Sequence, residues 1–176
     1  MKKLFLLVLS FLVLTVITVI SYLALFGYET SRFNNTITEI IKKNDENIDL
    51  KFEKVKVSLN IKKFSIYVKL TKPKLTYFGS KIPLDSLKAD INLFSAIKNE
   101  NIIKKIIINT QYMDFKSIRP IIVRSKPGNI KTILLNNIKS SKFKINSELE
   151  FDDNLELTNE TFFEGHVKET SIAITN

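Results

Sequence analysis

The residue types that most often carry catalysis are scarce in this sequence. His166 is the only histidine, and cysteine is absent. A metal site with two histidine ligands and any thiol chemistry are therefore excluded within this chain. His166 lies in the C-terminal stretch of predicted strands, so we expect its imidazole to belong to a partly exposed strand residue.

Acidic residues supply two further candidates near the C-terminal end. Asp152, Asp153 and Asn154 offer oxygen ligands for calcium, but the glycine and the distal glutamate of a calcium-binding loop are missing. Glu160 and Glu164 would suit acid–base chemistry only within a pocket, and no pattern around them predicts one. We predict a turn at 152–154, no metal or cofactor site, and no enzyme.

The elements that would position any site begin with a long apolar segment. No charged side chain occurs from Leu4 to Tyr28. A helix of that length covers roughly 35 Å, enough to cross a hydrocarbon core of about 30 Å. The segment is longer than the core of a cleaved signal peptide and lacks a good cleavage site. We predict an uncleaved signal anchor, a transmembrane helix over residues 1–28; a removed signal peptide is the alternative.

The charges that flank the anchor predict its orientation. Lys2 and Lys3 favour a cytoplasmic N-terminus, although Arg32, Lys42 and Lys43 on the far side weaken that bias. We expect a single-pass protein of the inner (cytoplasmic) membrane, with the bulk of the chain in the periplasm.

A second helix is predicted directly after the anchor, within residues 29–46. Thr30 or Ser31 would cap its first turn, and Lys42 and Lys43 suit the negative end of the helix dipole. We expect this amphipathic helix to pack on its own domain; the alternative is a plug at the membrane-proximal end of a sheet. The apolar stripe consists of Phe33, Ile37, Ile40 and Ile41.

From residue 47 onward, up to residue 176, the apolar pattern has a period of two, which is typical of strands with one apolar face, except at 94–99 and in the irregular stretch 117–135. Near Glu53 and Lys54 the apolar residues change from even-numbered to odd-numbered positions, a slip in parity that indicates a bulge or a turn. The run Phe78–Lys81 predicts a hairpin turn, and 94–99 predicts a short helical turn. Residues 130–135 fit either a strand or a helix.

These patterns predict a mainly β fold. We expect an antiparallel meander that forms an open, curved, groove-like sheet, an N-terminal transmembrane helix and one amphipathic helix. Too few helices are predicted to cover the apolar face. The alternation continues to Asn176, and an open edge strand invites pairing. We therefore expect further β-strands of a longer protein, or a partner protein, at the C-terminal edge of this β-rich extracytoplasmic domain.

The net charge of +9 bears on which classes of molecule the protein could bind. A basic surface near a bilayer attracts anionic headgroups. The lysines are scattered, arginine is scarce and no nucleic-acid motif is present, so we expect no nucleic-acid partner. Lysine-rich composition on a solvated surface is the simpler interpretation of the charge.

Three phrases of apolar alternation follow the predicted helix: Val68 to Leu75 around Pro73, Leu87 to Ile97, and Ile103 to Ile108. With the anchor and the helix before them, they resemble the N-terminal region of AsmA-like proteins, the envelope family that includes TamB and the YhdP type. The resemblance covers about Leu4 to Phe115. It implies a β-groove that starts at the inner membrane and lets phospholipid tails slide toward the outer membrane, a role in outer-membrane biogenesis.

The leading hypothesis is therefore an anchored lipid-transport module whose apolar β-groove contacts phospholipid acyl chains. The alternative is an anchored structural or interaction module with a closed β-sandwich. The candidate groove residues share one property, an apolar side chain on the repeating face of a predicted strand: Phe64, Ile66, Val68, Leu70, Leu87, Ile91, Leu93, Phe143, Ile145 and Leu149.

Overall fold

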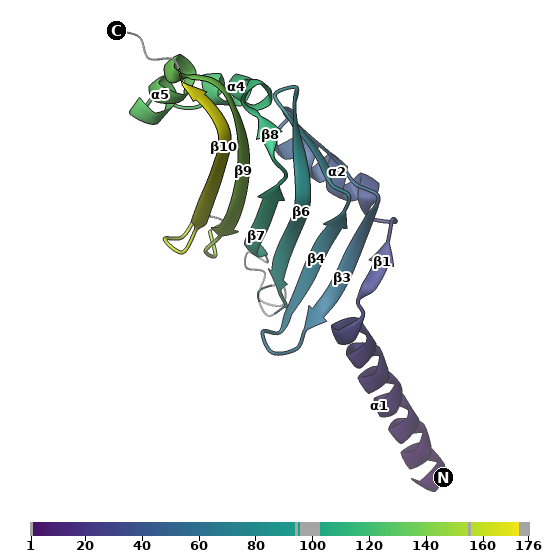
Figure 1. Cartoon of the computed structure of the whole chain (residues 1–176). Helices are drawn as coiled ribbons and strands as arrows, with labels where there is room; N and C mark the ends of the chain where they lie inside the picture. Colours follow the sequence, from purple (N-terminus) through teal and green to yellow (C-terminus); the bar gives the residue numbers. More distant parts are fainter. Residues whose placement is uncertain (1, 94, 96–102, 155, 173–176) are drawn as a thin grey trace.

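The computed structural model describes residues 2–93, 95, 103–154 and 156–172. It consists mainly of one curved antiparallel sheet with a long helix projecting from one end (Figure 1). We call the end of the sheet beside that helix the anchor end and the opposite end the distal end. The helices are α1 (Lys2–Leu25), α2 (Asn34–Asn44), α4 (Phe115–Arg124) and α5 (Asn129–Asn137).

The main path of the sheet has the strand order β1-β3-β4-β6-β7-β9-β10, and every pairing is antiparallel. A short extension pairs β2 with β5 and β5 with β6, while β8 pairs with β9. The strands are β1 (Tyr28–Thr30), β2 (Ile48–Lys51), β3 (Lys54–Asn60), β4 (Ser65–Thr71), β5 (Lys74–Tyr77), β6 (Ser80–Asn92), β7 (Ile103–Thr110), β8 (Met113–Asp114), β9 (Ile138–Glu150) and β10 (Phe162–Ile172).

Helix α1 is long and apolar enough to cross a membrane. Its 24 residues extend about 36 Å, and none of them is buried. The hydroxyls of Thr15 and Thr18 donate to the carbonyls of Phe11 and Leu14, so these polar groups are satisfied within the helix.

The helix is joined to the sheet without a long linker. Its last turn ends at Leu25, and β1 begins at Tyr28 and pairs with β3. Gly27 lies between them with a φ of +71°, and a Cβ there would lie 2.8 Å from the Val57 carbonyl oxygen. Only glycine fits this position without strain, because both the backbone conformation and the close approach exclude a side chain.

Replacement of Gly27 by alanine is expected to destabilise this junction. Gly79 provides a matched control, because its φ is +76° but a Cβ added there would meet nothing within 4 Å. The Gly79→Ala change should lower the free energy of unfolding by about 1 kcal/mol, and Gly27→Ala should cost more because of the added clash. Thermal unfolding of the full chain in detergent, followed by circular dichroism, measures both; equal losses would contradict the close packing at Gly27.

Two small clusters form the core, and both lie under helices. The first contains Leu50, Val55 and Leu70, and Ile37 and Ile41 of α2 pack against it. Helix α2 is also fixed by hydrogen bonds from the Asn34 amide to the Glu53 carbonyl and from the Thr38 hydroxyl to the Leu50 carbonyl.

The second cluster contains Met113 of β8 together with Phe115 and Ile118 of α4, and Leu134 and Leu135 of α5 pack against it. Helix α4 reaches across to the β5–β6 hairpin, where the Arg124 guanidinium lies 4.7 Å from the centre of the Phe78 ring. Helices α2, α4 and α5 lie toward the distal end (Figure 1).

The predicted fold class is confirmed: the structure is a mainly antiparallel, unclosed sheet with an apolar N-terminal helix. The apolar pattern changes sides at residues 52–53 because two strands meet there, not because one strand has a bulge. Strand β2 ends before these residues, β3 begins after them, and the two strands pair with different partners. The predicted hairpin at Phe78 is present between β5 and β6. The helical turn predicted at 94–99 lies almost entirely outside the described residues.

The predicted amphipathic helix is present as α2, and α4 and α5 form in addition to it. Pro120 sits inside α4, and the apolar residues 133–135, for which both a strand and a helix were open, belong to α5. Helix α2 starts at Asn34 without a side-chain cap, since the Thr30 hydroxyl instead accepts from the Arg32 amide. The expectation that this helix packs on its own domain is confirmed, because Ile37 and Ile41 of α2 pack against the first cluster at the distal end; the alternative of a plug at the membrane-proximal end is not met.

Candidate functional site: an apolar face on an open sheet

The register of the strands divides the sheet into two chemically different faces. Residues directly opposite each other on neighbouring strands point to the same side. One such row crosses five strands and is entirely apolar: Val57, Val68, Ala89, Ile106 and Leu149. We call the side that carries this row the apolar face and the other side the polar face.

Two parallel rows extend the apolar face along the strands. The row on the distal side contains Val55, Leu70, Leu87, Ile108 and Ser147, and the row on the anchor side contains Leu59, Ile66, Ile91 and Ile103. On the last two strands Phe143 lies opposite Val167, and Ile145 lies opposite Gly165. The apolar face is therefore continuous across the main sheet.

Helices cover only part of this face. Val55 and Leu70 are 2% and 5% exposed beneath α2, whereas the side chains toward the anchor end, including Ile66, Ala89 and Ile106, remain partly exposed. In the part of the chain that the structure describes, no second sheet packs across the face, so the packed sheets of a β-sandwich are not formed. Ala89 is the smallest side chain of the central row and leaves a low point between Val68 and Ile106.

A cleft of about 650 Å³ lies at the distal end, between the two helix-covered zones. Leu75 from the first zone and Ile82 and Met113 from the second zone line it. Lys51, Lys74, Lys81 and Asp114 supply charged groups around these apolar side chains. Its size and its mixed lining are those of a small-molecule pocket, with apolar walls and a few polar groups.

The structure brings most of the predicted groove residues to the apolar face. Ile66, Val68, Ile91, Ile145 and Leu149 lie on it and are at least partly exposed. On the same face, Leu70 belongs to the first cluster, Val68 and Leu87 also pack against that cluster, and Phe143 packs against the second. Phe64 and Leu93 lie beside each other at the anchor end, where the Leu93 amide donates to the Phe64 carbonyl at 3.2 Å.

Sequence reasoning left out several residues of the apolar face. Ala89 and Ile106 form the centre of the row, and Leu59 and Ile103 extend it toward the anchor end. The period-two pattern places Ala89 and Leu59 on apolar sides of their strands. In the run Ile106-Ile107-Ile108 every residue is apolar, so only the register with β6 and β9 identifies the face of each.

The polar face carries charged rows. Lys56, Lys69 and Lys88 lie directly opposite one another, an arrangement that suits a solvated surface because like charges repel. In the next row toward the anchor end, the Lys105 ammonium lies 2.9 Å from Glu150 and 2.5 Å from Glu148. These contacts raise the pKa of Lys105. The pKa of Glu150 is lowered, first by its hydrogen bond with Lys105 and second by its hydrogen bond with Glu160.

The Lys105 network predicts a pH-dependent contribution to stability. A carboxylate whose pKa is lowered by folding stabilises the protein above its unfolded pKa near 4.5, and this contribution is lost as the pH falls through the folded value. Lys105→Met should lower the free energy of unfolding by about 1 kcal/mol at pH 7 and by progressively less below pH 4.5. Urea unfolding at several pH values tests this; Lys69→Met, exposed on the same face, is the control. A pH-independent difference would contradict the role of Glu150.

The residues first considered for chemistry do not converge. His166 lies on β10 with its Nε2 atom 3.3 Å from Glu164, and hydrogen bonds from Asn146 and then His166 lower the pKa of Glu164. The Asp152 carboxylate accepts from the amides of Asn154 and Glu156, which confirms the predicted turn. Among the described residues no group of histidine or acidic side chains has the geometry to hold a metal ion.

The arrangement is suited to binding an apolar ligand. One face of the sheet offers aliphatic side chains that are neither fully covered nor interrupted by charge, and the other face is charged. Contact with an apolar chain would remove these side chains from water, which stabilises the complex in proportion to the area buried. No protein-family model, curated protein or solved structure matches this chain.

Proposed function

We propose that the protein is a membrane-anchored lipid-handling module of the AsmA-like type, in which the apolar face binds the acyl chains of phospholipids. The observation that carries this proposal is the row Val57, Val68, Ala89, Ile106 and Leu149, which crosses five strands and whose side chains all remain partly exposed, although Val57 and Val68 also touch the first cluster. A soluble domain would ordinarily bury such a row, because a large exposed apolar surface invites association.

The position of α1 supports a lipid as the ligand. A helix that can cross a bilayer joins directly to the sheet through Gly27 and β1, so the anchor end of the apolar face lies close to the membrane surface. Lys2 and Lys3 before the helix favour a cytoplasmic N-terminus. In this proposal the sheet lies in the periplasm, and acyl chains pass from the inner membrane onto the apolar face in support of outer-membrane biogenesis.

Native mass spectrometry of the full chain in a mild detergent tests the proposal. We expect at least one phospholipid to remain bound after the detergent is removed in the gas phase, because the acyl chain is held by the face and not only by the surface of α1. Spectra that contain the bare chain alone, under conditions in which its fold is retained, would contradict the proposal.

A second candidate function is a structural or interaction role at the edge of the sheet formed by β10. All residues of β10 are exposed, and within the described part of the chain no strand pairs with its outer side. We propose that a further strand, from a longer protein or a partner, adds to this edge. Hydrogen exchange in native membranes would then show slow exchange along β10; fast exchange there, with slow exchange in β9, would contradict it.

A further inference from the structure

The turn between β3 and β4 has an unusual composition for a solvent-exposed hairpin. It reads Ile61-Lys62-Lys63-Phe64, two lysines between two large apolar residues. Ile61 is 55% exposed and Phe64 is 48% exposed, and both lysines are exposed. Apolar side chains beside lysines are the composition of segments that lie in a membrane interface, where the rings and aliphatic groups enter the lipid and the ammonium groups meet headgroups.

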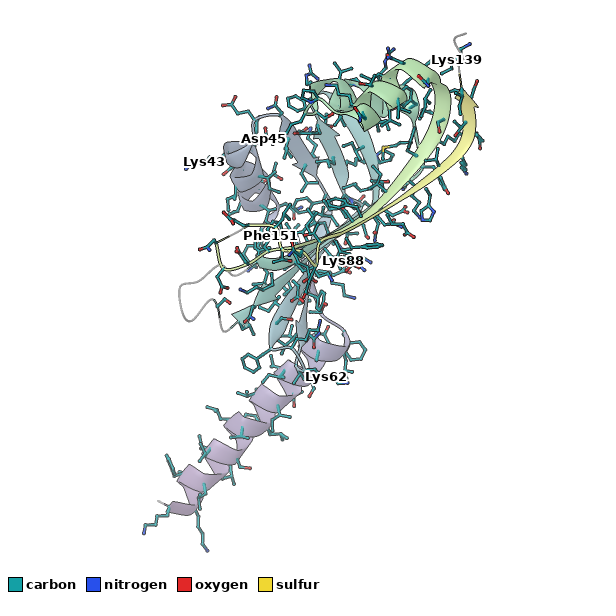
Figure 2. All side chains as sticks on the ribbon, turned by 90° about the vertical axis from the view of Figure 1, so that its left-hand side faces the viewer. Lys43, Asp45, Lys62, Lys88, Lys139 and Phe151 are labelled. Atoms are coloured by element: carbon teal, nitrogen blue, oxygen red, sulfur yellow. The ribbon has the colours of Figure 1, made fainter. Side chains whose placement is uncertain are left out.

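The strand register places this hairpin beside the end of α1. Tyr28 of β1 lies opposite Val57, and β3 runs antiparallel to β1, so the chain from Val57 to Ile61 returns toward the helix. At about 3.3 Å per residue this return covers roughly 13 Å. The C-terminal end of α1 lies against β3, and Figure 2 shows Lys62 next to the last turns of the helix.

The same end of α1 carries aromatic side chains suited to the membrane interface. The rings of Tyr22 and Phe26 lie 5.4 Å apart, and Tyr28 follows at the start of β1. Phe26 and Tyr28 are 64% and 53% exposed. Aromatic residues concentrate at the level of the lipid headgroups, so these rings indicate the depth at which α1 leaves the bilayer. The hairpin tip lies at a similar level.

We propose that the β3–β4 hairpin is a second membrane contact, in which Ile61 and Phe64 enter the headgroup region of the bilayer that holds α1 while Lys62 and Lys63 bind anionic headgroups. Together, α1 and the hairpin hold the sheet at two points, which fixes its orientation relative to the membrane. The proposal requires α1 to cross the bilayer, but it does not require the apolar face to bind acyl chains.

The absence of tryptophan from the sequence allows a direct test. Phe64→Trp places one fluorophore at the hairpin, and Phe78→Trp places one at the β5–β6 hairpin at the distal end; the backbone φ is 50° at Phe64 and 48° at Phe78. The full chain is reconstituted into vesicles of phosphatidylcholine and phosphatidylglycerol whose acyl chains are brominated near the headgroup. We expect the quenching constant of the Phe64→Trp protein to exceed that of the Phe78→Trp protein by about threefold or more.

Further variants separate the contribution of the lysines from that of the apolar side chains, and they keep the test valid if one variant fails to fold. Ile61→Trp should be quenched like Phe64→Trp, so failure of one variant to fold leaves the other as the test. Lys62→Gln with Lys63→Gln should reduce quenching in the mixed vesicles, and the reduction should be smaller in phosphatidylcholine alone. Equal quenching of the two hairpins, in protein that floats with the vesicles and is therefore anchored by α1, would overturn the proposal. Lipid binding by the apolar face is measured independently by native mass spectrometry. The hairpin proposal and the acyl-chain proposal can therefore each fail without the other.

Discussion

Replacement of Ala89 by glutamate is expected to reduce the phospholipid that co-purifies with the chain at least tenfold. Ala89 lies at the centre of the apolar row, between Val68 and Ile106. A bound acyl chain would cover the new carboxylate, and removal of a charge from water without a partner costs several kcal/mol. A loss of only about 1.4 kcal/mol already corresponds to a tenfold change in binding.

The neighbouring residue provides the control for this prediction. Lys88 precedes Ala89 on the same strand but lies on the polar face, so Lys88→Glu changes the charge without touching the proposed ligand. Phospholipid bound per chain, measured by mass spectrometry, should stay near the wild-type value for Lys88→Glu. The circular dichroism of both variants should remain that of the folded chain, since Ala89 is partly exposed. Equal lipid content in the two variants would contradict the proposed ligand.

The second large effect concerns stability. Leu70→Ala is expected to lower the free energy of unfolding by about 2–5 kcal/mol, because Leu70 is 5% exposed in the cluster beneath α2 and its truncation leaves a cavity. Native domains are stable by only about 5–15 kcal/mol, so this change removes a substantial part of the total. Urea unfolding of the full chain in detergent measures the difference.

The same strand supplies a matched truncation on the open part of the face. Ile66 lies four residues before Leu70 and points to the same side, but it is partly exposed. Ile66→Ala should cost clearly less than Leu70→Ala, since water or detergent can occupy the vacated volume. If both truncations cost the same, the apolar face would be a closed core along its whole length, contrary to the open sheet.

Hydrophobic periodicity predicts the class of this fold because the sheet is antiparallel and one-sided. Strand β4, and β6 from Leu87 to Ile91, alternate strictly, and their apolar parity identifies the side on which Ile66 and Leu87 lie. The apolar N-terminal helix is equally evident, since a long run without charge has few other structural solutions.

Helices α4 and α5 could not be predicted from local patterns, in contrast to α2. Pro120 favours the end of a helix, yet α4 continues through it because Phe115 and Ile118 are buried in the second cluster. The candidate site shows the same limit: periodicity places Leu70 and Ile66 on one face but does not say which of them α2 covers. That distinction depends on contacts between residues distant in sequence, such as Ile37 with the cluster of Leu50 and Leu70.

Site-specific photocrosslinking tests the central claim most directly. Ile106 and Ile107 are adjacent residues of the same type on β7, and the register places Ile106 on the apolar face and Ile107 on the polar face. A photoreactive phenylalanine derivative introduced at either position reports contact with lipid in intact cells. We predict a covalent phospholipid adduct, identified by mass spectrometry, from position 106 and little or none from position 107. Equal adducts from both positions, or none from position 106 in folded protein, would contradict acyl-chain binding by the apolar face.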